Sequence, residues 1–413
     1  MANLIKYLKN HAEAEVDLLA TFPQHKTYAH TLVIPAFKEK PDFIDSFIQS
    51  KLVQQNVLMI IVINQPQYEN STQDQQYLFD QALSTGQVAW QNENLTLVSI
   101  KDTNSSLLIV DRFTIPIADK LGVGLARKIG ADVACYLISE KVILTQWIHS
   151  SDADAKLPDD YFFTLALNKS KNSVAACYNF SHRSKNKLVE QANAIYEKAL
   201  RYYVAGLTYA NSRYNYFTIG SILAFNAEAY ASVRGFPKRS AGEDFYLLNK
   251  LAKLGEIIWL KEVEIILEAR MSDRVPFGTG PAVKHIVELI EQDESYHYYH
   301  PILFQYLKAL LLSFEKVYEY RDELSLWYKK LPDGVQESLA SIGFESFIEK
   351  QKLTKQAQFN KQLVVWFDAF KTLKFLHYLR DNYFPNIPIE EAISKADFPI
   401  IAMSKVQEKI SIY

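Results

Sequence analysis

The stretch LTQWIHSSDADAKLPDDYFFTLALNKS, residues 144–170, contains the pattern that much of the chain repeats. LTQWIHS (144–150) is apolar, as expected of a buried strand, and the residues from Pro158 onward have the apolar spacing of a helix. Asp152 and Asp154 lie between the two. Ligands bind to open α/β sheets beyond the carboxyl ends of the strands, so this stretch predicts both a fold and the position of a site.

The alternation of strand and helix extends through the first two thirds of the chain. Strands are predicted at residues 31–37, 56–66, 94–101, 106–113, 144–150 and 173–181, and helices at 40–54, 122–139, 158–170 and 186–210. Apolar strands that alternate with amphipathic helices form largely parallel sheets that are covered on both faces. The sequence therefore predicts an α/β fold.

The length and the changing pattern of the chain suggest more than one unit. The chain has 413 residues, which exceeds the usual size of a single domain. Residues 3–20 have the pattern of an amphipathic helix, and after about residue 290 we find helical patterns without strand candidates. We therefore expect an N-terminal helix in 1–27, an α/β domain in 28–292 and an all-helical C-terminal region in 293–413.

Composition excludes several classes of partner. The formal net charge is −2, so no overall positive field would attract nucleic acid. Cys135 and Cys177 lie in apolar surroundings without zinc-site spacing, which indicates a reducing compartment. The longest apolar run, residues 57–63, is too short to span a membrane, and the N-terminus lacks a signal-peptide pattern. We expect a cytoplasmic protein without a membrane span, and we leave peripheral association open.

The acidic residues of the opening stretch separate into two groups. Asp152 and Asp154 share one face of an extended segment, where a cation such as Mg²⁺ or Mn²⁺ would relieve their repulsion. An acidic loop without a ligand is the alternative for this pair. Asp159 and Asp160 follow Pro158 and are expected in the first turn of the next helix, where the helix dipole favours them.

Four motifs occur in a characteristic order. They are VIPAFKE (33–39), GVGLARKIGADVA (122–134), the Asp152–Asp154 pair and RGFPKRSAGEDFYLLNKLAKLG (234–255). Together they resemble the family 2 glycosyltransferases and their relatives of GT-A fold, over roughly residues 30–270. The resemblance implies a Rossmann-like, mixed and mainly parallel sheet that binds a nucleotide-diphospho-sugar.

On the donor side, the resemblance implies positions for the nucleotide and a metal. The nucleotide base would lie against Pro35, Ala36, Glu39 and Asn64, although VINQP (62–66) stands where the family commonly has an acidic pair. Either Arg127 or Lys128 would lie beside the diphosphate, or else carry a surface charge on its helix. Asp154 would bind Mn²⁺ or Mg²⁺, and Asp152 would hold the ribose or the metal.

On the acceptor side, the resemblance implies a base and a small-residue turn. Asp244 would take the proton from the acceptor hydroxyl with help from Glu243, unless the two residues only cap a helix. Gly220 and Ser221 would let the acceptor approach the backbone, or form a plain bend.

The segment 268–282 contains two arginines around a Gly-rich turn. Arg270 and Arg274 would belong to a loop that closes over the diphosphate, with an ordered surface loop as the alternative.

The predicted function is that of a metal-dependent glycosyltransferase. It would transfer a sugar from a UDP- or GDP-sugar to an acceptor hydroxyl, with inversion if Asp244 is the base. A retaining transferase and a non-catalytic nucleotide-sugar-binding protein remain alternatives. In the C-terminal region, Leu363, Trp366, Phe370 and Leu373 are predicted to share one helix face, as a core contact or the contact of a homo-oligomer.

Overall fold

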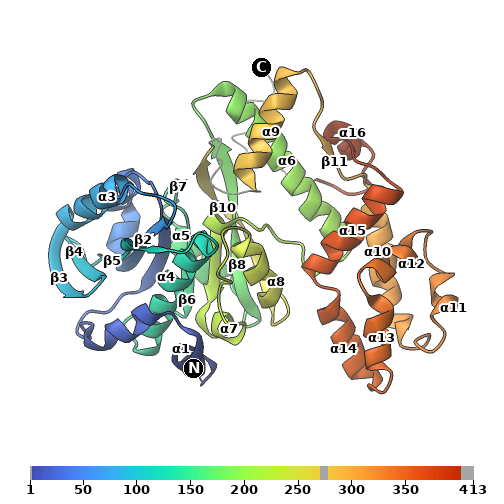
Figure 1. Cartoon of the computed structure of the whole chain (residues 1–413), viewed down its shortest axis with the longest axis horizontal. Coiled ribbons are helices and arrows are strands. Elements are labelled where there is room, and N and C mark those ends of the chain that lie inside the picture. The colour runs from blue at the N-terminus through green and yellow to red at the C-terminus, as the bar shows by residue number, and fades with distance from the viewer. Residues whose placement is uncertain (1, 270–277, 401–413) are drawn as a thin grey trace. The chain divides into compact units, whose positions relative to one another are not determined.

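The computed structural model describes residues 2–269 and 278–400, which divide into two compact units (Figure 1). The sheet unit comprises residues 1–185 and 218–281, and the helical unit comprises residues 186–217 and 282–413. The helix predicted at 186–210 is therefore part of the helical unit, whereas the sequence analysis included it in the domain 28–292. In the part of the chain that the structure describes, no helix is long and apolar enough to cross a bilayer.

A mixed sheet of ten strands forms the centre of the sheet unit. Its order is β3-β4-β5-β2-β1-β6-β9-β8-β10-β7. The bounds are β1 His30–Ala36, β2 Val57–Pro66, β3 Gly86–Asn92, β4 Leu95–Ile100, β5 Ser106–Ile117, β6 Trp147–Ser150, β7 Ala155–Lys156, β8 Ser173–Arg183, β9 Leu223–Asn226 and β10 Glu256–Glu268. The adjacent strands β5, β2, β1 and β6 are parallel, and β9 is antiparallel to both of its neighbours. The predicted α/β class is confirmed.

Of the strands that the sequence analysis did not predict, β3, β7 and β10 lie toward the edges of this sheet, and β9 lies inside it. The long segment after β2 forms helix α3 (Gln73–Ser84) and then the antiparallel strands β3 and β4, which extend the sheet beyond β5. Five of the seven residues of β3 are exposed, so β3 lacks the apolar signal of a buried strand. Strand β10 pairs with β8 in parallel and with β7 in antiparallel orientation.

Helix α4 (Gly122–Ser139) packs directly on the central strands. A Cβ atom on Gly130 would lie 2.4 Å from Cγ1 of Val33, so the missing side chain allows the helix to approach β1 closely. The remaining helices of the sheet unit are α1 Ala2–His11, α2 Asp42–Gln49, α5 Tyr161–Asn168, α7 Ala227–Ser232 and α8 Glu243–Leu251, with 3₁₀ helices at Ala14–Thr21, Lys51–Gln55 and Gly220–Ile222. The single helix predicted at 3–20 is wrong, because Glu13 has an extended backbone (φ −76°, ψ 159°) and separates α1 from a 3₁₀ helix.

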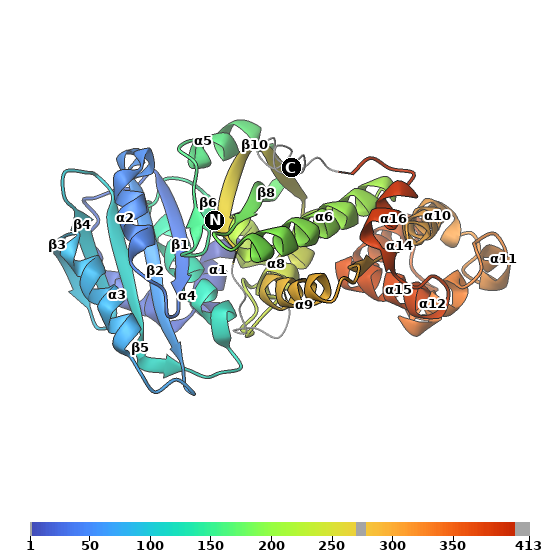
Figure 2. The same cartoon turned by 90° about the horizontal axis from the view of Figure 1, so that it is seen from above.

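The helical unit has an aromatic core. Its elements are α6 Lys187–Tyr209, α9 Thr279–Glu291, α10 Ile302–Val317, α11 Leu324–Tyr328, α12 Val335–Ser341, α13 Phe344–Gln351, α14 Gln356–Trp366, α15 Ala369–Asn382 and α16 Ile389–Ser394, with a small sheet of β11 (His297–Tyr298) and β12 (Ile387–Pro388). Figure 2 shows α10, α11, α12, α14, α15 and α16 grouped together. Helix α6 packs against this group, with Tyr202 and Leu207 in the same buried cluster as Phe304 and Phe375.

The predicted apolar stripe in the C-terminal region is wrong. Helix α14 ends at Trp366, and α15 begins after Asp368, whose side chain accepts a hydrogen bond from the backbone N–H of Lys371 at 3.1 Å. The helix boundary places Leu363 and Phe370 on different helices. Leu363 is buried in the core, and Phe370 is 38% exposed.

Candidate active site

The carboxyl ends of the parallel strands bring the predicted donor residues to one edge of the sheet. Ala36, the last residue of β1, pairs in register with Ile63, which precedes Asn64 on β2. On the other side of β1, the backbone N–H of Ser151 donates to the carbonyl oxygen of Val33 at 3.1 Å. The residues after β1, β2 and β6 therefore meet where the sequence analysis predicted a site.

Arg127 connects three segments at this edge. Its Nε donates to Oε1 of Glu243 at 2.9 Å, and its Nη2 donates to Oδ1 of Asp152 at 2.5 Å. Its Nη1 donates to Oγ of Ser150 at 2.9 Å and to the carbonyl oxygen of Ser151 at 3.3 Å. The Arg127 side chain is only 3% exposed and that of Glu243 only 6%, so this ion pair is shielded from water. Arg127 thus joins the residues after β6 to the start of α8.

Two glycines at the start of α4 allow the segment before Glu243 to reach this position. A Cβ atom on Gly122 would lie 2.5 Å from Cα of Ser240, and one on Gly124 would lie 2.6 Å from the carbonyl oxygens of Pro237 and Arg239. The backbone N–H of Gly124 also donates to the carbonyl oxygen of Arg239 at 3.0 Å. Residues 237–240 therefore lie directly against α4, one turn from Arg127.

Helix α8 begins with the two predicted catalytic carboxylates. Gly242, at the N-cap, has φ +73°, a conformation that glycine adopts readily and residues with a side chain rarely adopt. Glu243 and Asp244 form the first turn, and the backbone N–H of Phe245 donates to Oδ1 of Asp244 at 2.7 Å. The helix-start alternative weighed from the sequence is therefore observed, and Glu243 also binds Arg127.

The carboxyl group of Asp244 has a raised pKa. Burial, followed by the negative charge of Glu243, raises the pKa of Asp244 to about 7, against the lowering effects of the Phe245 N–H and Arg127. The charge of Asp152 also raises this pKa, so Asp244 belongs electrostatically to the Arg127 cluster. A carboxyl that titrates near neutral pH can accept a proton efficiently under ordinary conditions.

Gly220, which precedes Ser221, lies beside the guanidinium of Arg127. A Cβ atom on Gly220 would lie 2.5 Å from Nη2 of Arg127, so the guanidinium occupies the space of the missing side chain. The carbonyl oxygen of Ser221 accepts a hydrogen bond from Oγ of Ser151 at 2.8 Å. The predicted acceptor turn is therefore bound to the residues after β6 and helps to fix Arg127.

Asp152 and Asp154 are half-buried at the end of β6. Oδ1 of Asp152 accepts from Arg127, and the carboxylate retains Oδ2 for a second partner. Within the described residues, no cluster of three or more His, Cys, Asp or Glu side chains suitable for a metal ion is found. Two carboxylates are nevertheless a usual protein contribution to a Mg²⁺-type site whose other ligands are substrate phosphates.

Asp159 and Asp160 lie outside this cluster, as expected, but not within a helix. Helix α5 begins at Tyr161, and Asp160 is its N-cap residue without a side-chain capping bond. Asp159 is exposed and forms an ion pair with Lys51 at 2.9 Å. The predicted helix start at Pro158 is therefore too early by three residues.

Lys128 is in a different environment from Arg127. Its Nζ donates to the hydroxyl of Tyr7, to the carbonyl oxygen of His11 and to Oδ2 of Asp132, at 2.6, 2.9 and 2.7 Å. These three acceptors match the three N–H groups of a lysine ammonium. The alternative in which Lys128 lies beside the diphosphate is therefore not supported by its contacts.

Of the predicted base-binding residues, Pro35, Ala36 and Asn64 are buried, and Glu39 is half-buried. Arg270 and Arg274 lie outside the described residues. The sequence analysis missed the roles of Ser150 and Ser151, which bind Arg127 and the Gly220–Ser221 turn. Their position directly after an apolar strand and before Asp152 is a signal that could have identified them.

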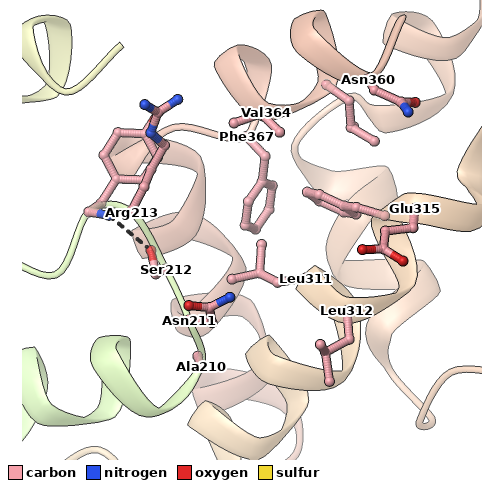
Figure 3. Close-up of a pocket in the computed structure, with 13 residues that line it drawn as sticks. Ala210, Asn211, Ser212, Arg213, Leu311, Leu312, Glu315, Asn360, Val364 and Phe367 are labelled. Atoms are coloured by element: carbon pink, nitrogen blue, oxygen red, sulfur yellow. Dashed lines mark hydrogen bonds between the residues drawn. The ribbon is translucent and has the colours of Figure 1, made fainter. Parts of the chain in front are cut away.

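A pocket of about 290 Å³ lies in the helical unit (Figure 3). Its lining includes Leu311, Leu312, Val364 and Phe367, with Glu315 among the polar residues. None of the residues predicted for the site lines this pocket.

Comparisons with known proteins add little to this geometry. No family model matches the sequence, and no curated protein matches it. The chain is similar to a solved structure described as "Crystal Structure of a Mycobacterial Protein", with 16% sequence identity and a TM-score of 0.31. The similarity covers 70% of this chain and 82% of that chain.

Proposed function

We propose that the chain is a metal-dependent glycosyltransferase of GT-A fold. It would transfer a sugar from a nucleotide-diphosphate donor, of UDP or GDP type, to an acceptor hydroxyl. The observation that carries the proposal is the buried Arg127, which holds Asp152 and Glu243 at one sheet edge although 91 positions separate these two carboxylates in the sequence. The two acidic motifs that the family resemblance assigns to donor and acceptor thus adjoin a single guanidinium.

Asp244 is the proposed catalytic base. As the acceptor oxygen forms a bond to the anomeric carbon, Asp244 takes the hydroxyl proton. The bond between the anomeric carbon and the donor phosphate oxygen breaks, and its electron pair leaves with the nucleotide diphosphate. A pKa of about 7 suits this role, because the carboxylate is available at neutral pH and still basic enough to accept the proton.

Asp152 and Asp154 are the proposed metal-binding residues. When bound, Mn²⁺ or Mg²⁺ supplies positive charge that stabilises the departing diphosphate. Asp152 is oriented by Arg127, so the carboxylate is held in place before the donor arrives. Arg127 itself is a positioning residue in this proposal, since its contacts are to the protein.

Isothermal titration tests the donor site. UDP and GDP are titrated with and without Mn²⁺ into the wild type, Asp154→Ala and the control Asp159→Ala, which removes an exposed carboxylate from the same stretch. We expect Mn²⁺ to raise nucleotide affinity at least tenfold in the wild type and the control, and not in Asp154→Ala. Nucleotide binding that is independent of both Mn²⁺ and Asp154 would overturn the donor-site assignment.

A second experiment tests the base. With a donor found by a thermal-shift screen of nucleotide-sugars, Asp244→Asn should lose transfer by a factor of about 10² to 10⁴, the usual contribution of a general base. Donor binding should persist. A wild type that binds the donor but never transfers the sugar would support the non-catalytic alternative. A product with retained anomeric configuration would show a retaining transferase instead of an inverting one.

A further inference from the structure

Helix α4, which carries Arg127, also carries a fully buried carboxylate, that of Asp132. Asp132 is 0% exposed, and four groups donate to it. Oδ1 accepts from the hydroxyls of Tyr7 and Tyr230 at 2.6 and 3.0 Å. Oδ2 accepts from Nζ of Lys128 and from the backbone N–H of Glu13 at 2.7 and 2.9 Å. A buried charge with this many donors fixes the segments that supply them, because each lost donor leaves a desolvated group unpaired.

Three of these donors attach the N-terminal segment, residues 2–13, to the rest of the sheet unit. Tyr7 comes from α1, Glu13 follows that helix, and Lys128 also binds the carbonyl oxygen of His11. At the other end of α1, the backbone N–H of Asn3 donates to Oε1 of Glu228 on α7 at 3.1 Å. The segment is therefore bound at both ends and in its middle.

The same segment contacts the stretch that leads to the candidate base. A Cβ atom on Gly235 would lie 2.5 Å from the hydroxyl oxygen of Tyr7 and 2.6 Å from that of Tyr230. Three residues later, Nζ of Lys238 lies 3.2 Å from Oε1 of Glu13. Within the stretch that precedes the acidic pair, Gly235 thus packs on Tyr7 and Lys238 pairs with Glu13.

Two residues between Lys238 and Asp244 make further contacts. Ser240 packs on Gly122, and the guanidinium of Arg239 lies 4.2 Å from the ring centre of Tyr246, on helix α8. Residues 235–242 are therefore held between the N-terminal segment on one side and α4 on the other.

We propose that the N-terminal segment is a positioning element of the candidate active site, in which Tyr7 and Glu13 hold residues 235–242 and thereby place Glu243 and Asp244 against Arg127. This inference rests on the proposed function only for its effect on transfer. Its structural part is independent of the reaction. Two readouts therefore separate the failure of one from the failure of the other.

The first readout is hydrogen exchange of peptides that cover residues 237–246, followed by mass spectrometry. The variants are Tyr7→Phe, Glu13→Gln and the control Lys6→Gln, which alters an exposed charge on the same helix. We expect roughly three- to tenfold faster exchange in these peptides for the first two variants and no change for the control. Unchanged exchange in both variants, or equally faster exchange throughout the sheet unit, would overturn the positioning role.

The second readout is the split between kcat and KM. Glu13→Gln should lower kcat at least threefold while the KM for the donor changes less than twofold, because the proposed donor carboxylates, Asp152 and Asp154, lie in the residues after β6. Lys238→Gln should reproduce this loss, and Lys238→Arg, which keeps the charge, should restore most of it. If the wild type transfers sugar and Glu13→Gln has the same kcat, the positioning inference is overturned and the proposed function is not. A wild type without transfer would count against the proposed function, and exchange at 237–246 would still decide the positioning.

Discussion

The guanidinium of Arg127 occupies the space that a side chain at Gly220 would need. A Cβ atom on the glycine would lie 2.5 Å from Nη2 and 3.0 Å from Cζ of the guanidinium. The backbone of Gly220 is not in the left-handed region, so its small size, rather than its flexibility, is what the site requires. The guanidinium is fixed on its other sides by hydrogen bonds to Glu243, Asp152 and Ser150.

Gly220→Ala should therefore displace Arg127 and loosen both acidic motifs at once. We expect a loss of about 1–3 kcal/mol in the free energy of unfolding, typical of an added methyl group in a packed site. Urea denaturation measures the loss. In an Arg127→Ala background the added methyl has space, so the same substitution should cost less than about 0.5 kcal/mol there. An equal loss of unfolding free energy in the two backgrounds would contradict the close contact between Gly220 and the Arg127 guanidinium.

The pH dependence of transfer should report the raised pKa of Asp244. Only the ionised carboxylate can take the acceptor proton, so kcat/KM should rise with pH and level off above about 7. In Glu243→Gln the neighbouring negative charge is lost, and the midpoint should move to lower pH. A profile from pH 5 to 9 measures both. A midpoint that stays in place in Glu243→Gln would argue against Asp244 as the titrating group.

Asp244 should also affect stability, in the direction opposite to that of a salt-bridged aspartate. Its pKa is about 7 in the folded chain and 3.8 as the ordinary value. Between these values the folded chain holds a proton that the unfolded chain has lost, so the free energy of unfolding falls as pH rises. The contribution is complete below about pH 4 and lost through about pH 7. The free energy of unfolding of the wild type minus that of Asp244→Asn should therefore fall over this range and stay constant above it.

Gly206→Ala tests the packing of the helical unit. A Cβ atom there would lie 2.5–2.6 Å from three ring atoms of Phe304. Alanine favours a helix over glycine by about 1 kcal/mol, but the clash should outweigh this gain and destabilise the unit by about 1–2 kcal/mol. Hydrogen exchange in α6 and α10 measures the effect. Phe304→Leu in the same chain should restore protection, and greater protection in Gly206→Ala alone would contradict this packing.

The sequence predicted which motifs lie close together better than it predicted what each side chain contacts. Arg127 and Lys128 were equivalent candidates, but successive residues of a helix point about 100° apart, so the two cannot face the same site. The motif pattern alone does not determine the rotation of α4. The structure shows which side of α4 faces the sheet, because Gly130 lies close to Val33 on β1.

The fold was predictable where burial leaves a strong pattern. The strands β1 and β2 are almost continuous apolar runs, and they form close to the predicted positions. The mostly exposed β3 gives no such signal. The periodicity of α6 predicted a helix with an apolar face, but a periodicity does not say which unit will cover that face. The membership of α6 in the helical unit follows from contacts with residues such as Phe304, roughly one hundred positions later.

The order of the segments has a consequence for synthesis on the ribosome. Helix α6 leaves the ribosome roughly ninety residues before α10, its partner at Phe304. At about 5–20 residues per second, its apolar face, with Tyr202 and Leu207, stays uncovered for roughly 5 to 20 s while the last strand of the large sheet is still being made. During that interval the nascent chain presents a hydrophobic helix to its surroundings, which is the kind of segment that chaperones bind.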